Sequence, residues 1–154
     1  KPEWVLRLLS YPVDCVGGPV VKKQDQEAYN VRATRWPIPR CPKTGLLEVD
    51  GLGTGFLRLS RKALQILWEG SEPYHDDWGK AHRWMFEVGP RNGRLVSEDM
   101  ALCAKLAAAG IKVYLDPTIT CDHAGTKVWR GDVADWLARC EAPSASTTSP
   151  KPTA

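Results

Sequence analysis

Residues 97–117 constrain the fold most strongly, because they predict a helix that leads directly into a strand. Glu98 and Asp99 would lie in the first helical turn, where the helix dipole favours negative charge. The apolar positions at helical spacing are Met100, Cys103, Leu106 and Ala107. Gly110 is typical of the residue that follows a helix, and the apolar run 111–115 predicts a strand. Such a unit indicates an α/β fold in which helices flank a mixed sheet.

The rest of the chain repeats this alternation. Further helices are expected at residues 2–9, 61–69 and 132–140, and strands at 13–21, 46–50, 56–59 and 84–88. Residues 142–154 are rich in Pro, Ser and Thr, which predicts a disordered tail after a single domain over residues 1–141. Because Lys1 leads at once into the first helix, we expect the chain to be part of a longer protein.

Charge and cysteine content argue against several classes of protein. The net charge is +3 and the Lys and Arg residues form no dense run, so nucleic-acid binding is not expected. No apolar run approaches the roughly 20 residues that span a bilayer. The five cysteines include no CxxC pair, which argues against a structural zinc site and favours reduced thiols in a cytoplasmic protein.

Two short motifs contain groups that can do chemistry. Ser97-Glu98-Asp99 places carboxylates at a helix start, where one of them can serve as a general base. Ordinary helix capping explains the same three residues without any function. His123 follows Asp122 at a strand end, and a neutral imidazole is a natural metal ligand there, although a lone histidine is more often structural or exposed.

Residues 50–55 hold three glycines at alternate positions, Gly51, Gly53 and Gly55. Glycines in this arrangement let the backbone approach a ligand closely. The pattern is not GxGxxG and leads into a strand-like run, so a dinucleotide-binding loop is disfavoured. A strained turn or a bulged strand pair is the alternative explanation.

Aromatic side chains are unusually frequent, with seven Trp in 154 residues. Those in the middle of the chain are Trp36, Trp68, Tyr74, Trp78, Trp84 and Phe86. Aromatic faces can stack on sugar rings, and Asp76 and Asp77 can bond sugar hydroxyls, while core packing explains most Trp residues equally well. His75 and His82 are expected to be exposed.

The order of these motifs resembles a known enzyme family. Residues 50–56 read D-G-x-G-x-G-F, residues 97–117 read S-E-D-x-x-L-C-x-K-x-x-x-x-G-x-x-V-x-x-D-P, and residues 123–125 read H-x-G. These blocks are similar to those of bacterial and phage family 2-like glycosyltransferases with the GT-A fold. Residues 2–9 are similar to the helix after the Asp-x-Asp motif of that family, and the resemblance spans about residues 1–130.

The resemblance implies a partial GT-A fold, the acceptor-side half of the enzyme. In such enzymes a divalent metal, Mn²⁺ or Mg²⁺, bridges the diphosphate of a nucleotide-sugar donor to Asp-x-Asp. That motif and the nucleotide-binding half would precede Lys1 and are expected to be missing from this chain. His123 matches the downstream histidine that completes the metal shell in related enzymes.

The resemblance also implies roles for the remaining motif residues. By motif position Asp99 is the base that accepts the acceptor's hydroxyl proton when the reaction inverts the anomeric centre. Glu98 would contact the acceptor or orient the site, and Trp84 is expected to contact a sugar. The residues expected against the donor sugar are Gly53, Thr54 and Gly55, with Asp50 near them.

We therefore predict a metal-dependent glycosyltransferase that moves a sugar to the hydroxyl of a saccharide, lipid-linked or protein acceptor. One alternative is a non-catalytic half-domain, derived from such an enzyme, that binds a saccharide or a partner chain. Another is an unrelated α/β protein in which the match is incidental.

Overall fold

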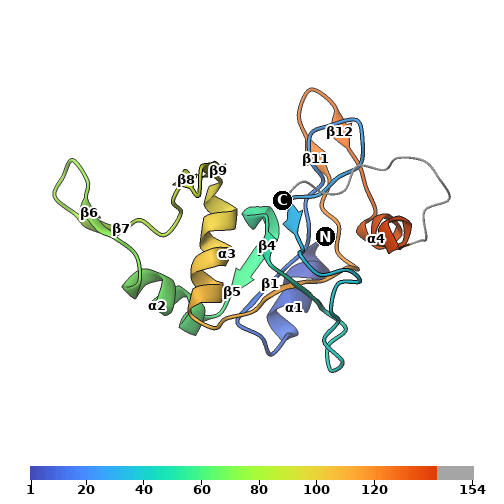
Figure 1. Cartoon of the computed structure of the whole chain (residues 1–154), viewed down its shortest axis with the longest axis horizontal. Coiled ribbons are helices and arrows are strands. Elements are labelled where there is room, and N and C mark those ends of the chain that lie inside the picture. The colour runs from blue at the N-terminus through green and yellow to red at the C-terminus, as the bar shows by residue number, and fades with distance from the viewer. Residues whose placement is uncertain (142–154) are drawn as a thin grey trace.

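A small mixed sheet forms the centre of the fold. In the computed structural model, which describes residues 1–141, this sheet has four strands (Figure 1). In sheet order they are β3 (Leu47–Val49), β10 (Val113–Leu115), β1 (Cys15–Gly17) and β5 (Leu57–Leu59). β1 and β10 are parallel, with Cys15 opposite Val113, whereas β3 and β5 run antiparallel to their neighbours. The predicted α/β class with a mixed sheet is therefore confirmed.

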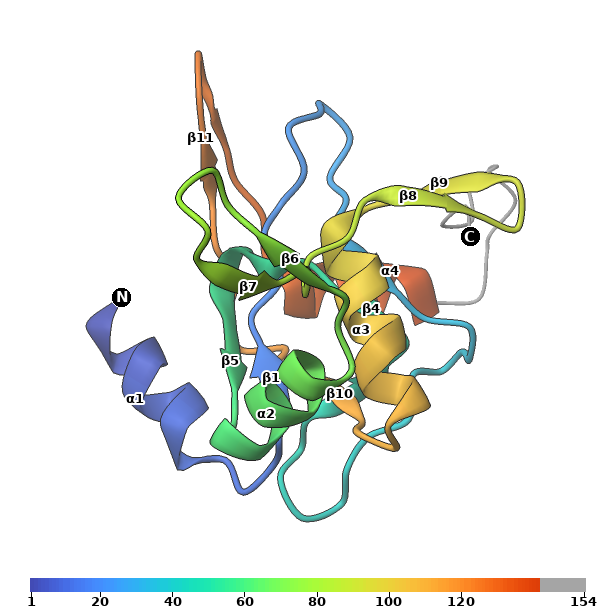
Figure 2. The same cartoon turned by 90° about the vertical axis from the view of Figure 1, so that its left-hand side faces the viewer.

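Helices pack around this sheet. They are α1 (Pro2–Ser10), the short 3₁₀ helix η1 (Thr54–Phe56), α2 (Arg61–Glu69), α3 (Glu98–Ala108) and α4 (Val133–Glu141). Figure 2 shows α2 and α3 side by side, with α1 apart from them. The side chain of Ser60 caps α2 by accepting the N–H of Ala63 at 3.1 Å. The four predicted α-helices are all present, with ends that differ by one or two residues.

The sheet carries an apolar core on each side, because successive residues of a strand face opposite ways. Cys15 belongs to the larger core, together with Leu67 of α2 and Leu106 of α3. Val16 belongs to the smaller core, which holds Leu8 of α1. β1 is thus buried on both faces, as expected for a central strand.

Four further strand pairs lie outside the central sheet. They are β2 (Val31–Arg32) with β4 (Gly51–Leu52), β6 (Pro73–His75) with β7 (Ala81–Arg83), β8 (Gly89–Arg91) with β9 (Arg94–Val96), and β11 (His123–Ala124) with β12 (Val128–Trp129). Residues 72–96 carry β6 to β9 and leave the body between α2 and α3 (Figures 1 and 2). We call these residues the arm. The turn between β8 and β9 has positive φ at both Asn92 and Gly93, 52° and 75°, as a two-residue type I′ hairpin turn requires.

The predicted strand at residues 84–88 is wrong. β7 ends before this stretch and β8 begins after it. The carbonyl groups of Trp84 and Met85 accept hydrogen bonds from Lys105 Nζ of α3, at 3.0 and 3.4 Å, instead of from a neighbouring strand. The Lys105 side chain therefore satisfies two backbone carbonyls that a neighbouring strand would otherwise bond.

Other expectations have mixed outcomes. The strand predicted over residues 13–21 is limited to β1, since Pro19 has no N–H to donate to a ladder. The predicted tail at residues 142–154 lies outside the described residues. Within residues 1–141 no helix is both long enough and apolar enough to cross a bilayer. The five cysteines form no disulfide, and burial raises the pKa of the Cys15 thiol to about 12.

Candidate functional site

The two longest sequence motifs lie against each other in the fold. The N–H of Leu52 donates to Cys103 Sγ at 3.4 Å, and the thiol points back to the Leu52 carbonyl at 3.6 Å. A Cβ atom on Gly51 would lie 2.5 Å from Met100 Sδ, so glycine is needed for this close approach to α3. The fold therefore brings the start of the glycine-rich run to the first half of α3, across about fifty residues of chain.

Asp99 lies beside this contact, one residue before Met100, and is 6% exposed. Its Oδ1 accepts from the backbone N–H of Met100 at 2.8 Å and from the hydroxyl of Ser97. Its Oδ2 accepts from the side-chain amide of Asn30. Ser97 occupies the N-cap position of α3, but its hydroxyl donates to Asp99 and makes no capping bond. Capping by Ser97 is therefore absent, whereas Asp99 itself accepts a free N–H of the first turn and has one further donor, Asn30, from outside the helix.

Asn30 is a site residue that the sequence did not reveal. Its backbone carbonyl accepts the N–H of Gly53 at 2.8 Å, while its side-chain amide donates to Asp99. A Cβ on Gly53 would lie only 3.1 Å from Asn30 Nδ2, so the glycine leaves room for this amide. Gly53, the middle glycine of the run, thus helps to position the Asn30 side chain that donates to Asp99.

The other predicted site residues of these motifs are more exposed. Glu98 is exposed, and its side chain makes no hydrogen bond or ion pair within residues 1–141. Thr54 is half-buried and Gly55 is exposed, both in η1. A Cβ on Gly55 would lie 3.0 Å from Val20 Cγ2, so this glycine also permits a close approach. Glu98 and the η1 backbone are thus available to a ligand from solvent.

His123 begins β11 and is held in one orientation. Its Nδ1 lies 3.1 Å from the carbonyl oxygen of Val21, which can only accept, so Nδ1 carries the proton. In this tautomer Nε2 is the ring atom able to bind a metal, an arrangement typical of histidine ligands. No group of three or more His, Cys, Asp or Glu that could hold a metal occurs within residues 1–141. The described residues therefore supply at most part of a metal shell.

One short segment connects His123 to Asp99. Val21, which accepts from His123, forms an antiparallel bridge with Tyr29. The next residue, Asn30, donates to Asp99. Both views place the start of α3 and the β11–β12 hairpin on the upper side of the molecule (Figures 1 and 2). His123 and Asp99 thus have a common neighbour, the segment 21–30, which bonds His123 through Val21 and Asp99 through Asn30.

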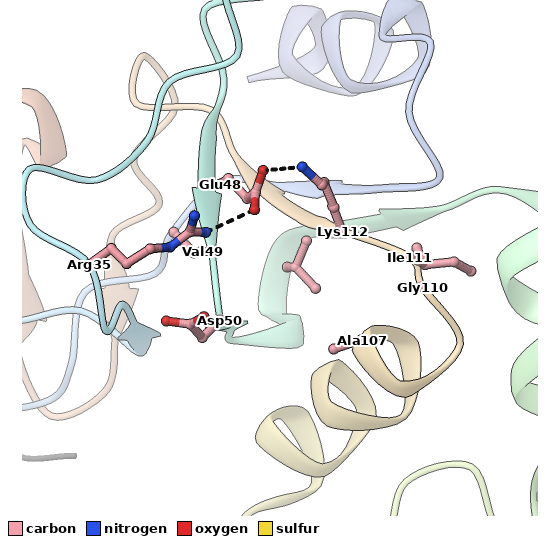
Figure 3. A pocket seen from close by; sticks show the side chains of 9 residues that line it. Arg35, Glu48, Val49, Asp50, Ala107, Gly110, Ile111 and Lys112 are labelled. Atoms are coloured by element: carbon pink, nitrogen blue, oxygen red, sulfur yellow. Dashed lines mark hydrogen bonds and ion pairs between the residues drawn. The ribbon is translucent and has the colours of Figure 1, made fainter.

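Asp50 does not join this cluster. Its carboxylate accepts from the backbone N–H and the hydroxyl of Thr34, at 2.5 and 2.8 Å. It lines a hollow of about 320 Å³ that also contacts Ala107, in the last turn of α3 (Figure 3). Asp99 is eight residues earlier, about 12 Å along the helix. The Asp50 carboxylate is therefore bonded to Thr34 and makes no hydrogen bond to the groups around Asp99.

The hollow has an apolar floor and a charged rim whose groups are already paired. Glu48 accepts from Lys112 Nζ and Arg35 Nη2, each at 2.8 Å (Figure 3). The hydrogen bond from Lys112, then that from Arg35, holds the pKa of Glu48 below its ordinary value. Because each charged group on the rim has a partner, the hollow presents no free group for catalysis.

Trp84 also lies outside the Asp99 cluster. Its indole N–H donates to the carbonyl of Phe86 at 3.0 Å, and its side chain is 51% exposed. Its carbonyl accepts from Lys105, six residues after Asp99 and about 9 Å further along α3. The fold therefore places Trp84 beside the second half of α3, on the arm.

Comparison with known proteins gives no relative. No family model matches the sequence, and neither a curated protein nor a solved structure matches the chain. The α/β class is established by the fold itself, and the GT-A assignment stays a prediction from the order and spacing of the motifs.

Proposed function

We propose that this chain is the acceptor side of a metal-dependent glycosyltransferase that moves a sugar from a nucleotide-sugar donor to an acceptor hydroxyl. One observation carries the proposal. The Asp99 carboxylate is oriented by Ser97, Met100 and Asn30, and the backbone carbonyl of Asn30 in turn accepts the N–H of Gly53 in the glycine-rich run. A general base must be oriented toward the proton that it accepts, and these three donors fix the orientation of the Asp99 carboxylate.

In the proposed reaction Asp99 accepts the proton of the acceptor hydroxyl as that oxygen forms its bond to the anomeric carbon. The bond from the anomeric carbon to the donor diphosphate breaks, and the diphosphate leaves with its electrons. Glu98, exposed one residue earlier, contacts the acceptor. The backbone of Gly53, Thr54 and Gly55 lines the donor sugar.

A divalent cation, Mn²⁺ or Mg²⁺, would neutralise charge that develops on the leaving diphosphate. His123 would supply one ligand through Nε2, since its Nδ1 is committed to Val21. The remaining ligands would come from outside the described residues and from the donor. We also place the protein in the cytoplasm, on the basis of its five unpaired cysteines.

A second candidate is a binding module without catalysis. Its support is the 6% exposure of Asp99, because a base must reach its substrate. Under this alternative the three donors to Asp99 stabilise the start of α3, and the chain only binds a saccharide or a partner chain.

Nucleotide-sugar turnover distinguishes the two candidates. The 154-residue chain, and any longer polypeptide that contains it, would be incubated with Mn²⁺ and UDP-glucose, UDP-galactose, UDP-N-acetylglucosamine, GDP-mannose or dTDP-rhamnose. Release of nucleoside diphosphate is the readout. Asp99→Asn is expected to lower turnover by about 10²-fold or more. Asp135→Asn, an exposed change on α4, is the matched control.

Equal turnover in the wild type and Asp99→Asn would remove Asp99 as the base. Absence of turnover with every donor in every polypeptide tested would leave the binding module as the better account.

A further inference from the structure

Exposed aromatic side chains gather on the arm, residues 72–96. Six aromatic residues are among the large hydrophobic side chains exposed within residues 1–141, and four of these six belong to the arm. They are Tyr74 (49% exposed), Trp78 (89%), Trp84 (51%) and Phe86 (46%). This concentration cannot be explained by core packing, the alternative that the sequence left open.

The turn at the tip of β6–β7 holds Trp78 out in solvent on a fixed backbone. Asp76 Oδ1 accepts from the N–H groups of Trp78 and Lys80, at 3.0 and 2.8 Å, and Oδ2 lies 2.8 Å from His82 Nε2. Gly79 adopts a φ of +75° and donates to the Asp76 carbonyl at 2.9 Å. The expectation that His82 is exposed is wrong, because its ring is half-buried and lies against Asp76, and the two side chains build the turn. A tip that is already ordered loses little conformational entropy on binding.

A second aromatic platform lies behind the tip. Tyr74 and His82 face each other across β6–β7, with ring centroids 5.3 Å apart and an interplanar angle of 22°. Polar side chains lie around the two platforms. His75, Asp77 and Lys80 are exposed, and their side chains make no hydrogen bond or ion pair within residues 1–141. The hairpin thus presents separate aromatic faces, each beside free donors and acceptors.

This chemistry fits a saccharide better than other partners. A sugar ring has an apolar C–H face that packs on an aromatic ring and a rim of hydroxyls that needs donors and acceptors. A protein partner would be expected to need a broader continuous apolar patch. The exposed large aliphatic side chains of the arm, Val88 and Leu95, both lie outside the β6–β7 hairpin. Residues 72–83 carry three acidic and two basic side chains, which is unfavourable for nucleic acid or an anionic membrane.

The arm is fixed to the helix that carries Asp99. Lys105 of α3 donates to Ser71 Oγ at 3.2 Å and to the carbonyl of Trp84 at 3.0 Å, and its ammonium pairs with Glu87 at 2.5 Å. Its side chain is only 17% exposed, so these bonds are shielded from water. A ligand on the arm is therefore held at a defined distance from the start of α3.

We infer that the β6–β7 hairpin is a saccharide-binding site, with Trp78 and the Tyr74–His82 pair as its platforms. Identification of the bound saccharide as the acceptor rests on the proposed function, whereas the binding itself does not.

The test is titration of the 154-residue chain with maltooligosaccharides, cellooligosaccharides and chitooligosaccharides, from disaccharide to hexasaccharide, without nucleotide or metal. Calorimetry gives the Kd, and the indole N–H signals in ¹H–¹⁵N NMR spectra report the site. We expect at least one series to shift the Trp78 signal, and Trp78→Ala to raise the Kd at least about tenfold. Trp78 is almost fully exposed, so its removal should leave the fold intact.

Trp36→Ala is the matched control, because Trp36 is 39% exposed and contacts Trp136, away from the arm. The inference is overturned if no series shifts the Trp78 signal, or if Trp36→Ala weakens binding as much as Trp78→Ala. Trp78→Ala is tested for binding without nucleotide or metal and Asp99→Asn is tested for turnover, so failure of the saccharide site and failure of the proposed function are separate results.

Discussion

Asp116→Asn is expected to destabilise the protein by removing a buried acceptor that ties α1 to the end of β10. Asp116 is 1% exposed. It accepts from Arg7 Nε at 2.7 Å, from the Tyr11 hydroxyl at 2.8 Å, and from the N–H and hydroxyl of Thr118 at 2.9 and 2.7 Å. A carboxamide keeps one oxygen for Thr118 but presents an N–H₂ group to Arg7 and Tyr11.

The size of the loss follows from these partners. A hydrogen bond to a charged group contributes about 1.5–3 kcal/mol to the free energy of unfolding. Arg7 is 48% exposed, so water replaces part of what it loses. We therefore expect Asp116→Asn to cost about 2 kcal/mol, and Asp116→Ala, which leaves Tyr11 and Thr118 without an acceptor, about 3–5 kcal/mol.

The pH dependence has a defined sign. Burial raises the pKa of Asp116, but the hydrogen bonds from Thr118, Arg7 and Tyr11 outweigh it, and the pKa is lowered in the folded protein. Its contribution is therefore complete above the pKa of an unfolded aspartate, about 3.9, and is lost as the pH falls through the lower folded value.

Urea unfolding of the wild type and Asp116→Asn between about pH 2 and pH 7 measures both effects. The difference in free energy of unfolding should be largest near neutral pH and shrink in acid. Equal stability at pH 7, or a difference that does not change with pH, would refute this account of Asp116.

Two further predictions concern close packing and the root of the arm. A Cβ on Gly18 would lie 2.2 Å from Ile119 Cγ2, so Gly18→Ala should lower the free energy of unfolding by about 1–3 kcal/mol, whereas Gly89→Ala, with open space around it, should change it little. Lys105→Met should speed hydrogen exchange and proteolysis in residues 72–96, because the arm loses its bonds to α3, and Lys62→Met on the surface of α2 should not. Comparable protection in both lysine variants would contradict the anchoring role of Lys105.

Local patterns were enough to predict the four α-helices and the four strands of the central sheet. α2 follows from Ser60 before it and Gly70 after it, and α3 from its apolar stripe and acidic first turn. The central position of β1 is also consistent with its apolar sequence. These features depend on neighbours within a few residues, which a sequence displays directly.

The rest depended on contacts between distant residues. Asn30 has no local mark of function, because its role comes from Asp99, sixty-nine residues later. Residues 84–88 look like a strand, but the lysine that binds their carbonyls lies on another element. Asp50 belongs to the same motif as Gly53, yet its carboxylate bonds Thr34 and not the groups around Asp99. The sequence did not show which side chains of these motifs touch, because each contact joins residues that are far apart along the chain.

The parallel pairing of β1 with β10 has a consequence for folding during synthesis. Cys15 lies opposite Val113, and Arg7 bonds Asp116 across 109 residues. Until residues 113–116 have been made, β1 can pair with β5 but not with β10, and Arg7 of α1 has no Asp116 to bond. Contacts of such long sequence separation form slowly. We therefore expect a nascent chain to protect α1 and β1 from protease only after residue 116 has left the ribosome, when both edges of β1 can close together.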